Sequence, residues 1–285
     1  MERNTETFLC CDASYEEAGI VLYGAPFDST TSYRPGTRFA SRTMRAESYG
    51  LESYSPYQDL DMEDALVFDG GDLELCFGDT EKALSAIHSF AARILSDGKL
   101  PFLIGGEHLV SLPAIEAVFE KYPELCLIHF DAHTDLRDDY LGARLSHATV
   151  IRRAWDLLRD GRIHQFGIRS GERAEFSWAK EHTDLHKFSF DGLEAVIQEL
   201  EGKPVYLTID LDVMDPSVFP GTGTPEYGGV SFMELLHAAG KVIRGCQVVG
   251  CDMVELSPPL DATGASTAAA LKLLREMLLC LSCKS

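Results

Sequence analysis

From Leu125 to Asp135 the chain reads LCLIHFDAHTD, an apolar run followed by a short polar cluster. The run Leu125–Phe130 has the length and apolar content of a strand that is buried on both faces. Asp131, His133 and Asp135 are spaced i, i+2 and i+4, so in extended backbone their side chains lie on one side. Reactive side chains at the end of a buried strand are typical of parallel α/β proteins.

Apolar runs of the same kind recur along the whole chain. They lie at Ile20–Tyr23, Ala65–Phe68, Pro101–Ile104, Ile163–Phe166, His186–Phe190, Val205–Ile209 and Gln247–Val249. Amphipathic stretches of helical period separate most of them, at Thr80–Leu95, His108–Lys121, His147–Arg159, Phe232–Ile243 and Ala265–Leu281. This alternation predicts an α/β fold with a mainly parallel sheet of about eight strands between two layers of helices. The absence of a repeat or linker favours one domain over residues 1–285.

The charge balance limits the class of ligand. The 285 residues include 45 acidic and 25 basic side chains, which gives a net charge of −20. An acidic excess opposes binding to a phosphate backbone and favours cationic small molecules or metal ions. We therefore expect no nucleic-acid partner.

The chain has no sequence feature of a membrane or secreted protein. No apolar run approaches the roughly 20 residues that span a bilayer, and the start lacks a basic region followed by an apolar one. The eight cysteines are scattered, so we expect reduced thiols and a cytoplasmic protein without a membrane partner. Cys280 and Cys283 have C-x-x-C spacing but lack a second pair, which favours an ordinary apolar helix over a zinc site.

Three other predicted strands also end in polar clusters. Gly105-Gly106-Glu107-His108, Asp210-Leu211-Asp212 and Asp252-Met253-Val254-Glu255 each follow an apolar run. Because the carboxyl ends of parallel strands meet at one edge of a sheet, these side chains and those of residues 131–135 are expected to converge.

Converging carboxylates need a positive counter-charge, and neither aspartate cluster contains Lys or Arg. Oxygen-rich ligands with imidazole suit a pair of divalent ions, manganese first, better than one tetrahedral zinc. Capping aspartates in a strand-end loop and a plain helix-start role for His108 are the alternatives. His129 is expected in the core or behind the ligands. The predicted ligands are His108, Asp131, His133, Asp135, Asp210 and Asp212.

Together with Asp210–Pro216 and the following Pro220–Pro225, these motifs resemble the ureohydrolase family of arginases and agmatinases over nearly the whole chain. The resemblance implies an arginase-like fold, an eight-stranded sheet with two Mn²⁺ ions at the strand ends. It places the ions on the same six ligands. It also implies a symmetric homo-oligomer, often a trimer or hexamer.

The resemblance further implies the catalytic residues. The family's proton-shuttling histidine matches His147 in Ser146-His147-Ala148-Thr149, and its guanidinium-binding glutamate matches Glu255. A metal-bridging hydroxide, steadied by Asp135, would attack the guanidinium carbon. His147, with an ordinary pKa near 6.5, would protonate the leaving amine. The alternatives are a helix-capping histidine and a solvated loop acid.

The resemblance favours agmatine, which would give putrescine and urea. Residues 136–145 lack the asparagine with which arginases hold the α-carboxylate of arginine. Acidic residues near the mouth, with Glu172 and Asp138 as substrate contacts, suit a ligand with a terminal amine. Arg137 and Arg144 instead suit a guanidino acid such as guanidinobutyrate, or pair on the surface.

Two further activities and two loops complete the expectations. A zinc amidohydrolase of acetylated amines does not explain a second metal site, and a silent relative is expected to have lost a ligand or His147. Residues 216–229 read as a rigid loop, with Thr222 or Thr224 as a contact or in a purely structural role. Residues 27–39 are expected to pack by the pocket or a subunit contact, without a catalytic role.

Overall fold

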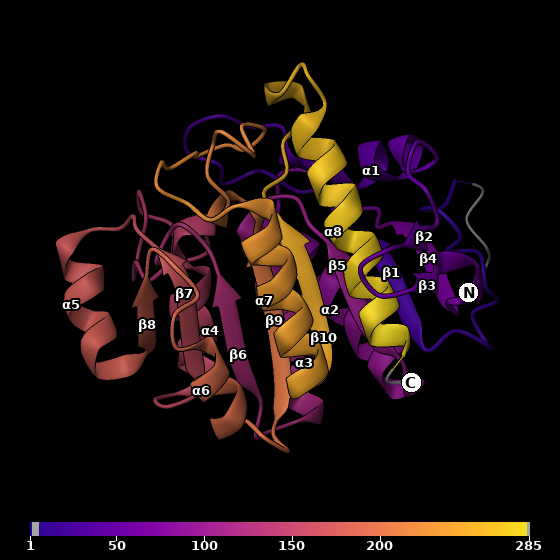
Figure 1. Cartoon of the computed structure of the whole chain (residues 1–285). Coiled ribbons are helices and arrows are strands. Elements are labelled where there is room, and N and C mark those ends of the chain that lie inside the picture. The colour runs from indigo at the N-terminus through magenta and orange to yellow at the C-terminus, as the bar shows by residue number, and fades with distance from the viewer. Residues whose placement is uncertain (2–5, 284–285) are drawn as a thin grey trace.

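Eight parallel strands form one sheet in the computed structural model, which describes Met1 and residues 6–283 (Figure 1). The order across the sheet is β4-β1-β5-β10-β9-β6-β7-β8. The strands are β1 Ile20–Gly24, β4 Val67–Asp72, β5 Leu100–Ile104, β6 Cys126–Phe130, β7 Ile163–Ile168, β8 Asp184–Lys187, β9 Pro204–Asp210 and β10 Gln247–Val254. The predicted three-layer α/β arrangement is confirmed.

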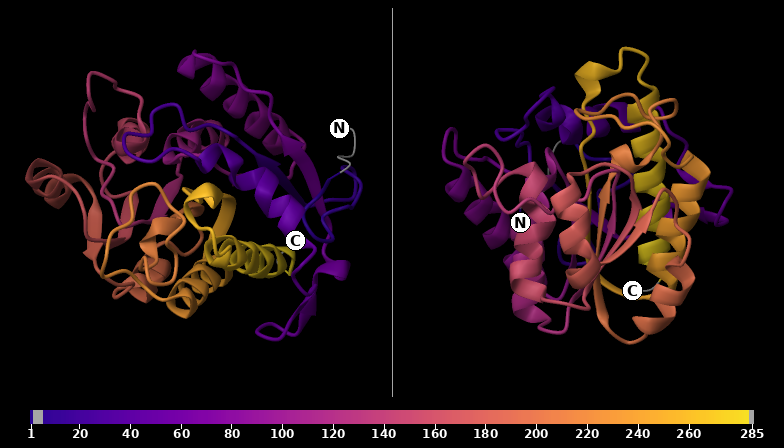
Figure 2. Two further views of the ribbon diagram at one scale, coloured as in Figure 1. Left: turned by 90° about the horizontal axis from the view of Figure 1, so that it is seen from above. Right: turned by 90° about the vertical axis from the view of Figure 1, so that its left-hand side faces the viewer.

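Helices cover both faces of the sheet (Figure 2). One layer contains α2 Thr80–Ser96, α3 Ser111–Lys121 and α4 Val150–Leu158, with α5 Arg173–His182 beside β8. The other layer contains α1 Ala40–Ser48, α6 Leu193–Glu199, α7 Phe232–Gly245 and α8 Ala265–Ser282. Each face of the sheet therefore has its own apolar core.

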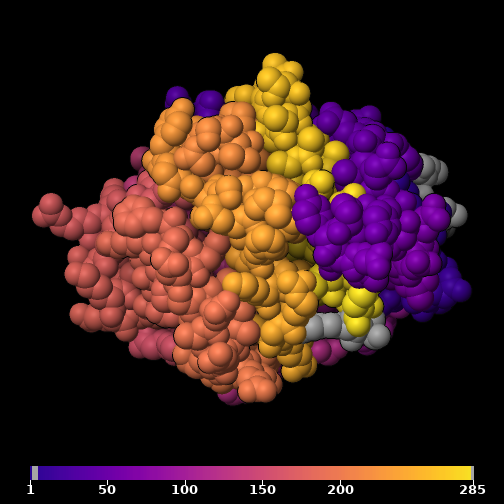
Figure 3. Space-filling model, in the orientation of Figure 1, coloured from indigo at the N-terminus to yellow at the C-terminus, as the bar shows by residue number. Residues whose placement is uncertain are grey.

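The two cores explain why the central strands are apolar throughout. Side chains alternate between the faces, so Ile128 of β6 belongs to the core under α7 and α8, whereas Leu127 belongs to the core under α2 to α4. Both side chains are fully buried. A short hairpin of β2 Tyr54–Ser55 and β3 Leu60–Asp61 follows α1, and this segment lies beside α8 on the face drawn in Figure 3.

Local signals set several helix starts. Asp79 and Ser231 accept hydrogen bonds from the backbone amides three residues later and so cap α2 and α7. The predicted helices at His108 and His147 begin instead with single 3₁₀ turns, His108–Val110 and His147–Thr149, before α3 and α4. The prediction missed α1, α5 and α6, which are short.

The predicted strand His186–Phe190 is wrong in position, since β8 covers Asp184–Lys187. Phe188 has φ of 68°, so the extended backbone ends there. Phe190 still contributes to the core, because its ring lies 4.6 Å from that of Phe130. The aromatic residues Phe188 and Phe190 led the sequence pattern to place the strand too far toward the C-terminus.

The strand order places the polar clusters next to one another. β5 and β6 follow each other in the sequence but enclose β10 and β9 in the sheet, so the four carboxyl ends that carry predicted site residues are adjacent. No helix in the described part of the chain is long and apolar enough to cross a membrane.

Candidate active site

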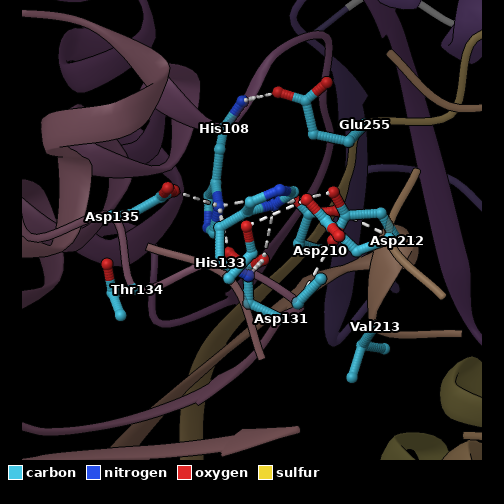
Figure 4. A network of polar contacts seen from close by, with 12 residues as sticks. His108, Asp131, His133, Thr134, Asp135, Asp210, Asp212, Val213 and Glu255 are labelled. Carbon is cyan, nitrogen blue, oxygen red and sulfur yellow. Dashed lines mark hydrogen bonds and ion pairs between the residues drawn. The ribbon is translucent and has the colours of Figure 1, made fainter. Parts of the chain in front are cut away.

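The six predicted ligands converge at the carboxyl ends of β5, β6 and β9 (Figure 4). His108 Nδ1 lies 3.2 Å from Asp131 Oδ2, 3.1 Å from Asp135 Oδ2 and 3.4 Å from Asp210 Oδ2. His133 Nδ1 lies 3.0 Å from Asp212 Oδ2 and 3.5 Å from Asp131 Oδ1. Asp131 thus stands between the two histidines, where a carboxylate can bridge two ions.

Thr208 and Asp252 fix the orientation of the His108 ring on the side away from the aspartates. Thr208 Oγ1 donates to Asp252 Oδ1 at 2.6 Å, so its oxygen is free to accept from His108 Nε2, 3.0 Å away. Tyr206 donates to the other Asp252 oxygen. With a proton on Nε2, the Nδ1 lone pair of His108 would be the ligand atom for a cation bound among the aspartates.

His129 supports Asp131 from within the core, as expected. Gln165 Nε2 donates to His129 Nδ1 at 3.1 Å, so the ring proton lies on Nε2 and is donated to Asp131 Oδ2 at 2.7 Å. The group His108, His129, Asp131 and Asp135 also has the spacing of a metal cluster. Because its Nε2 is used as a donor, we place His129 behind the ligands.

Crowding of like charges shifts the pKa values in this cluster. Burial and the Asp131 carboxylate raise the pKa of Asp135 to about 7. Burial, Asp212 and Asp131 raise the pKa of Asp210 well above its usual range. Burial opposes charge on His108, yet the carboxylates of Asp131, Asp135 and Asp210 raise its pKa well above the ordinary value. The carboxylates thus compete for positive charge.

The residues fit divalent ions. His108 Nδ1 and Asp212 Oδ2 are buried and lack a well-directed hydrogen bond among the described residues. Two overlapping groups have ligand spacing, one around His108 and one formed by Asp131, His133 and Asp212. Oxygen and imidazole donors without thiolate match hard or borderline metals. The His/Asp cluster is therefore a candidate centre for two ions.

Glu255 enters the same pocket from the end of β10. Its Oε1 accepts the His108 backbone N–H at 2.7 Å, while its own N–H donates to Gly106 O at 3.0 Å. Burial and the neighbouring Glu107 raise the pKa of Glu255 well above its ordinary value. A buried carboxylate in this state gains most from a cationic ligand, such as a guanidinium group.

His147 lies across a cavity of about 270 Å³ that it lines together with His133, Asp135 and Glu255. In this position the pKa of His147 departs from the ordinary imidazole value near 6.5. Burial, aided by the charges of His133, His108 and Arg137, outweighs a stabilising contact with Thr30 and lowers the pKa of His147 to about 4. The imidazole is therefore neutral at neutral pH.

Comparison with known proteins places this geometry in a family. The model of the arginase family matches residues 18–280. The chain belongs to the arginase family. An agmatinase of Bacillus subtilis is 48% identical over 278 residues, with 96% of each chain covered. A guanidinobutyrase of Pseudomonas aeruginosa is 39% identical, with 93% of this chain and 87% of the relative covered.

Solved structures agree with the arginase-family fold. The crystal structure of a proposed agmatinase from Clostridium difficile is 54% identical, with a TM-score of 0.93 over 95% of this chain and 99% of that one. An agmatine ureohydrolase of Thermoplasma volcanium is 34% identical, with a TM-score of 0.88 over 98% and 94%. The predicted fold and family are confirmed.

The charged residues that the sequence assigned to the mouth of this arginase-family pocket divide into two groups. Arg137 and Glu172 line the pocket and pair with each other at 2.8 Å, and the Arg137 guanidinium stacks on Tyr140. Asp138 instead accepts from Arg153 at 2.7 Å, and Arg144 pairs with Asp156. The structure thus brings Glu172 to the pocket, whereas Asp138 lies outside its lining.

Two loops close over the arginase-family site. Thr224 lines the pocket, whereas Thr222 is buried beneath it. Arg34 donates to the carbonyl groups of Thr222 and Gly223 and so ties residues 27–39 to this loop. Sequence reasoning missed one contact entirely, because Thr30 accepts the His147 N–H although the two residues are 117 positions apart.

Proposed function

We propose that this chain is a manganese-dependent ureohydrolase that hydrolyses agmatine to putrescine and urea. The observation that carries the proposal is the position of Glu255, a buried carboxylate that shares one pocket with the His/Asp cluster. A carboxylate beside a metal centre suits a cationic guanidinium whose carbon is to be attacked. The agmatinases of Bacillus subtilis and Bacillus anthracis, at 48% and 47% identity, support the same substrate.

His108, Asp131, Asp135 and Asp210 would hold one Mn²⁺ ion, and Asp131, His133 and Asp212 would complete the second site. When bound, the two ions activate a water molecule as the nucleophile. The mixture of carboxylate and imidazole ligands favours manganese over zinc.

The chain's own residues orient the substrate and move a proton. Glu255 keeps one oxygen on the His108 N–H, which leaves Oε2 to accept from the guanidinium. Asp135 accepts a hydrogen bond from the attacking water. His147 is neutral at neutral pH, so it would first accept a proton from solvent and then pass that proton to the leaving amine.

Glu172 is the proposed contact for the amine of agmatine. It stands in the pocket lining with its side chain 59% exposed, so it can turn toward a ligand that enters the cavity. The ion pair with Arg137 holds it at the mouth. Asp138, turned toward Arg153, would act on the substrate only through the local negative potential.

A second candidate substrate is a guanidino acid. Arg137 lines the pocket, and a guanidinium there could bind a carboxylate in place of Glu172. The Pseudomonas aeruginosa guanidinobutyrase, at 39% identity, supports this alternative. Agmatine remains first because Glu172 and Glu175 already neutralise Arg137.

Localisation and assembly are part of the proposal. A cytoplasmic enzyme is supported by the eight cysteines, which are scattered along the chain as is typical of reduced thiols. A homo-oligomer, as a trimer or hexamer, would have a mass three or six times the 31.4 kDa of one chain.

The test is urea release by the manganese-loaded protein on agmatine, arginine, guanidinobutyrate and guanidinopropionate, with a chelated control. We expect urea from agmatine and none after chelation. Urea from guanidinobutyrate alone would replace agmatine by the second candidate. Release of acetate from acetylated amines, without urea from any guanidino compound, would support an amidohydrolase instead.

A further inference from the structure

One buried carboxylate next to the site has no part in the mechanism described above. Glu107 is fully buried, and the hydrogen bonds to its carboxylate come from a loop and not from the predicted metal ligands. Oε2 accepts from the Thr30 N–H at 2.8 Å and from the Thr31 hydroxyl at 3.1 Å, and Oε1 accepts from the Thr30 hydroxyl. A carboxylate with three such donors fixes the backbone and the side chains of the loop that supplies them.

The same loop reaches His147. The Thr30 hydroxyl hydrogen points to Glu107, so the oxygen is left to accept the His147 N–H at 3.1 Å. Ser32 Oγ lies 3.3 Å from His147 Nε2. The loop therefore holds both the backbone and the ring of the histidine.

The loop also packs against the segment that follows β5 and carries Glu107. Gly106 N–H donates to Ala25 O at 3.0 Å, and Glu107 N–H donates to Phe27 O at 2.8 Å. A Cβ at Gly106 would lie 1.9 Å from Phe27 O, so only glycine permits this approach. Gly106 thus allows the segment that carries Glu107 to lie directly against the loop that contacts His147.

We propose that Glu107 and Thr30 are positioning residues, which hold His147 at the distance from the metal centre that proton transfer requires. This inference rests on the proposed role of His147 in hydrolysis. Small displacements of a proton-transfer group reduce turnover strongly, whereas they leave ground-state binding nearly unchanged. The effect should therefore appear in kcat and not in KM.

The test uses a matched pair of variants in the manganese-loaded, full-length protein. Thr30→Val keeps the shape and removes the hydroxyl, and Thr30→Ser restores it. We expect Thr30→Val to lower kcat on agmatine by about 3- to 10-fold, with KM within about twofold and manganese content unchanged, because the hydroxyl loses both its bond to Glu107 and the one it accepts from the His147 N–H. Thr30→Ser should recover most of the rate. Glu107→Gln, which keeps only one acceptor oxygen for the Thr30 N–H and the Thr30 hydroxyl, should act in the same direction as Thr30→Val.

A double-mutant cycle separates positioning from a general effect on the fold. In the His147→Ala background, Thr30→Val should cause no further loss of kcat. An equal loss in both backgrounds would overturn the inference, as would a Thr30→Val variant with the wild-type rate.

A second readout does not depend on the substrate. Crystal structures of Thr30→Val and Thr30→Ser should show His147 displaced only in Thr30→Val. An unmoved His147 in both variants would overturn the positioning role even if agmatine is the substrate. Displacement of His147 in a protein that releases no urea would instead show that the proposed function, and not the positioning, is wrong.

Discussion

Asp131 is a proposed metal ligand and His147 a proposed proton-transfer group, so their variants should lose different properties. Asp131 lies between both histidine ligands, so Asp131→Ala should remove bound manganese and lower turnover by more than about 1000-fold. His147→Ala should keep two ions and lower kcat by about 100- to 10,000-fold, the usual contribution of a proton-transfer group. Elemental analysis beside urea release measures both. Full manganese occupancy in Asp131→Ala would contradict the metal site.

Glu255 offers a variant that separates charge from shape. In Glu255→Gln the amide oxygen can still accept the His108 N–H, but the charge for the guanidinium is gone. We expect kcat/KM on agmatine to fall by about 10- to 100-fold, the value of a hydrogen bond to a charged group. Burial and Glu107 disfavour the charged glutamate, so Tm should stay equal or rise.

The control for that variant is its manganese content, which should equal that of the wild type. An unchanged kcat/KM would remove Glu255 from the substrate site. A fall in Tm together with lost manganese would instead assign Glu255 a structural role, which is to hold the segment after β5 that contains His108.

At the scale of elements, the loop after β9 is closed by one carboxylate. Asp215 Oδ1 accepts from the Ser217 hydroxyl and N–H, and Oδ2 accepts from the N–H groups of Gly228 and Gly229 at 2.8 and 3.1 Å. The Ser217 contacts and then the glycine amides lower the pKa of Asp215 to about 2. Because the folded-state pKa lies below the unfolded value near 4, this carboxylate stabilises the fold above about pH 4 and loses its contribution as the pH falls toward 2.

Asp215→Asn should therefore destabilise the protein only where the carboxylate is ionised. We expect a Tm about 2–4 °C below the wild type at pH 7, since an uncharged amide cannot accept four hydrogen bonds. The gap should narrow at pH 3, where the wild-type group begins to protonate. Calorimetry at both pH values measures it, and a gap that is constant with pH would refute the titration of Asp215.

The elements also show what sequence patterns can predict. Asp131, His133 and Asp135 converge as expected, but the extended backbone assumed for them is absent. β6 ends at Phe130 and Asp135 has φ of 51°, so the loop after the strand brings these side chains together. The contact between Thr30 and His147 joins positions 117 apart, and no local period encodes it. The depressed pKa of His147 has the same origin, since burial comes from segments distant in the chain. The β8 prediction failed because aromatic content does not fix where the backbone turns.

At the scale of the whole molecule, charge and fold act together. The chain has a net charge of −20, and its sheet directs four strand ends with acidic residues to a single edge. The negative potential that attracts a cationic guanidino compound also raises the cost of folding the ligand cluster. Bound cations relieve that cost, so the metal centre should stabilise the fold as well as supply chemistry.

Removal of the metal should therefore lower the stability of the entire chain. A ligand present at 100 times its Kd adds about 2.7 kcal/mol, and each kcal/mol shifts the Tm of a chain of this length by roughly 2–4 °C. We expect chelation to lower Tm by about 5–10 °C and added Mn²⁺ to restore it. His147→Ala should respond like the wild type, whereas Asp131→Ala should not respond to either treatment. If neither chelator nor Mn²⁺ changes the Tm of the wild type, the charge of the ligand carboxylates must be neutralised by protonated histidines and not by bound metal.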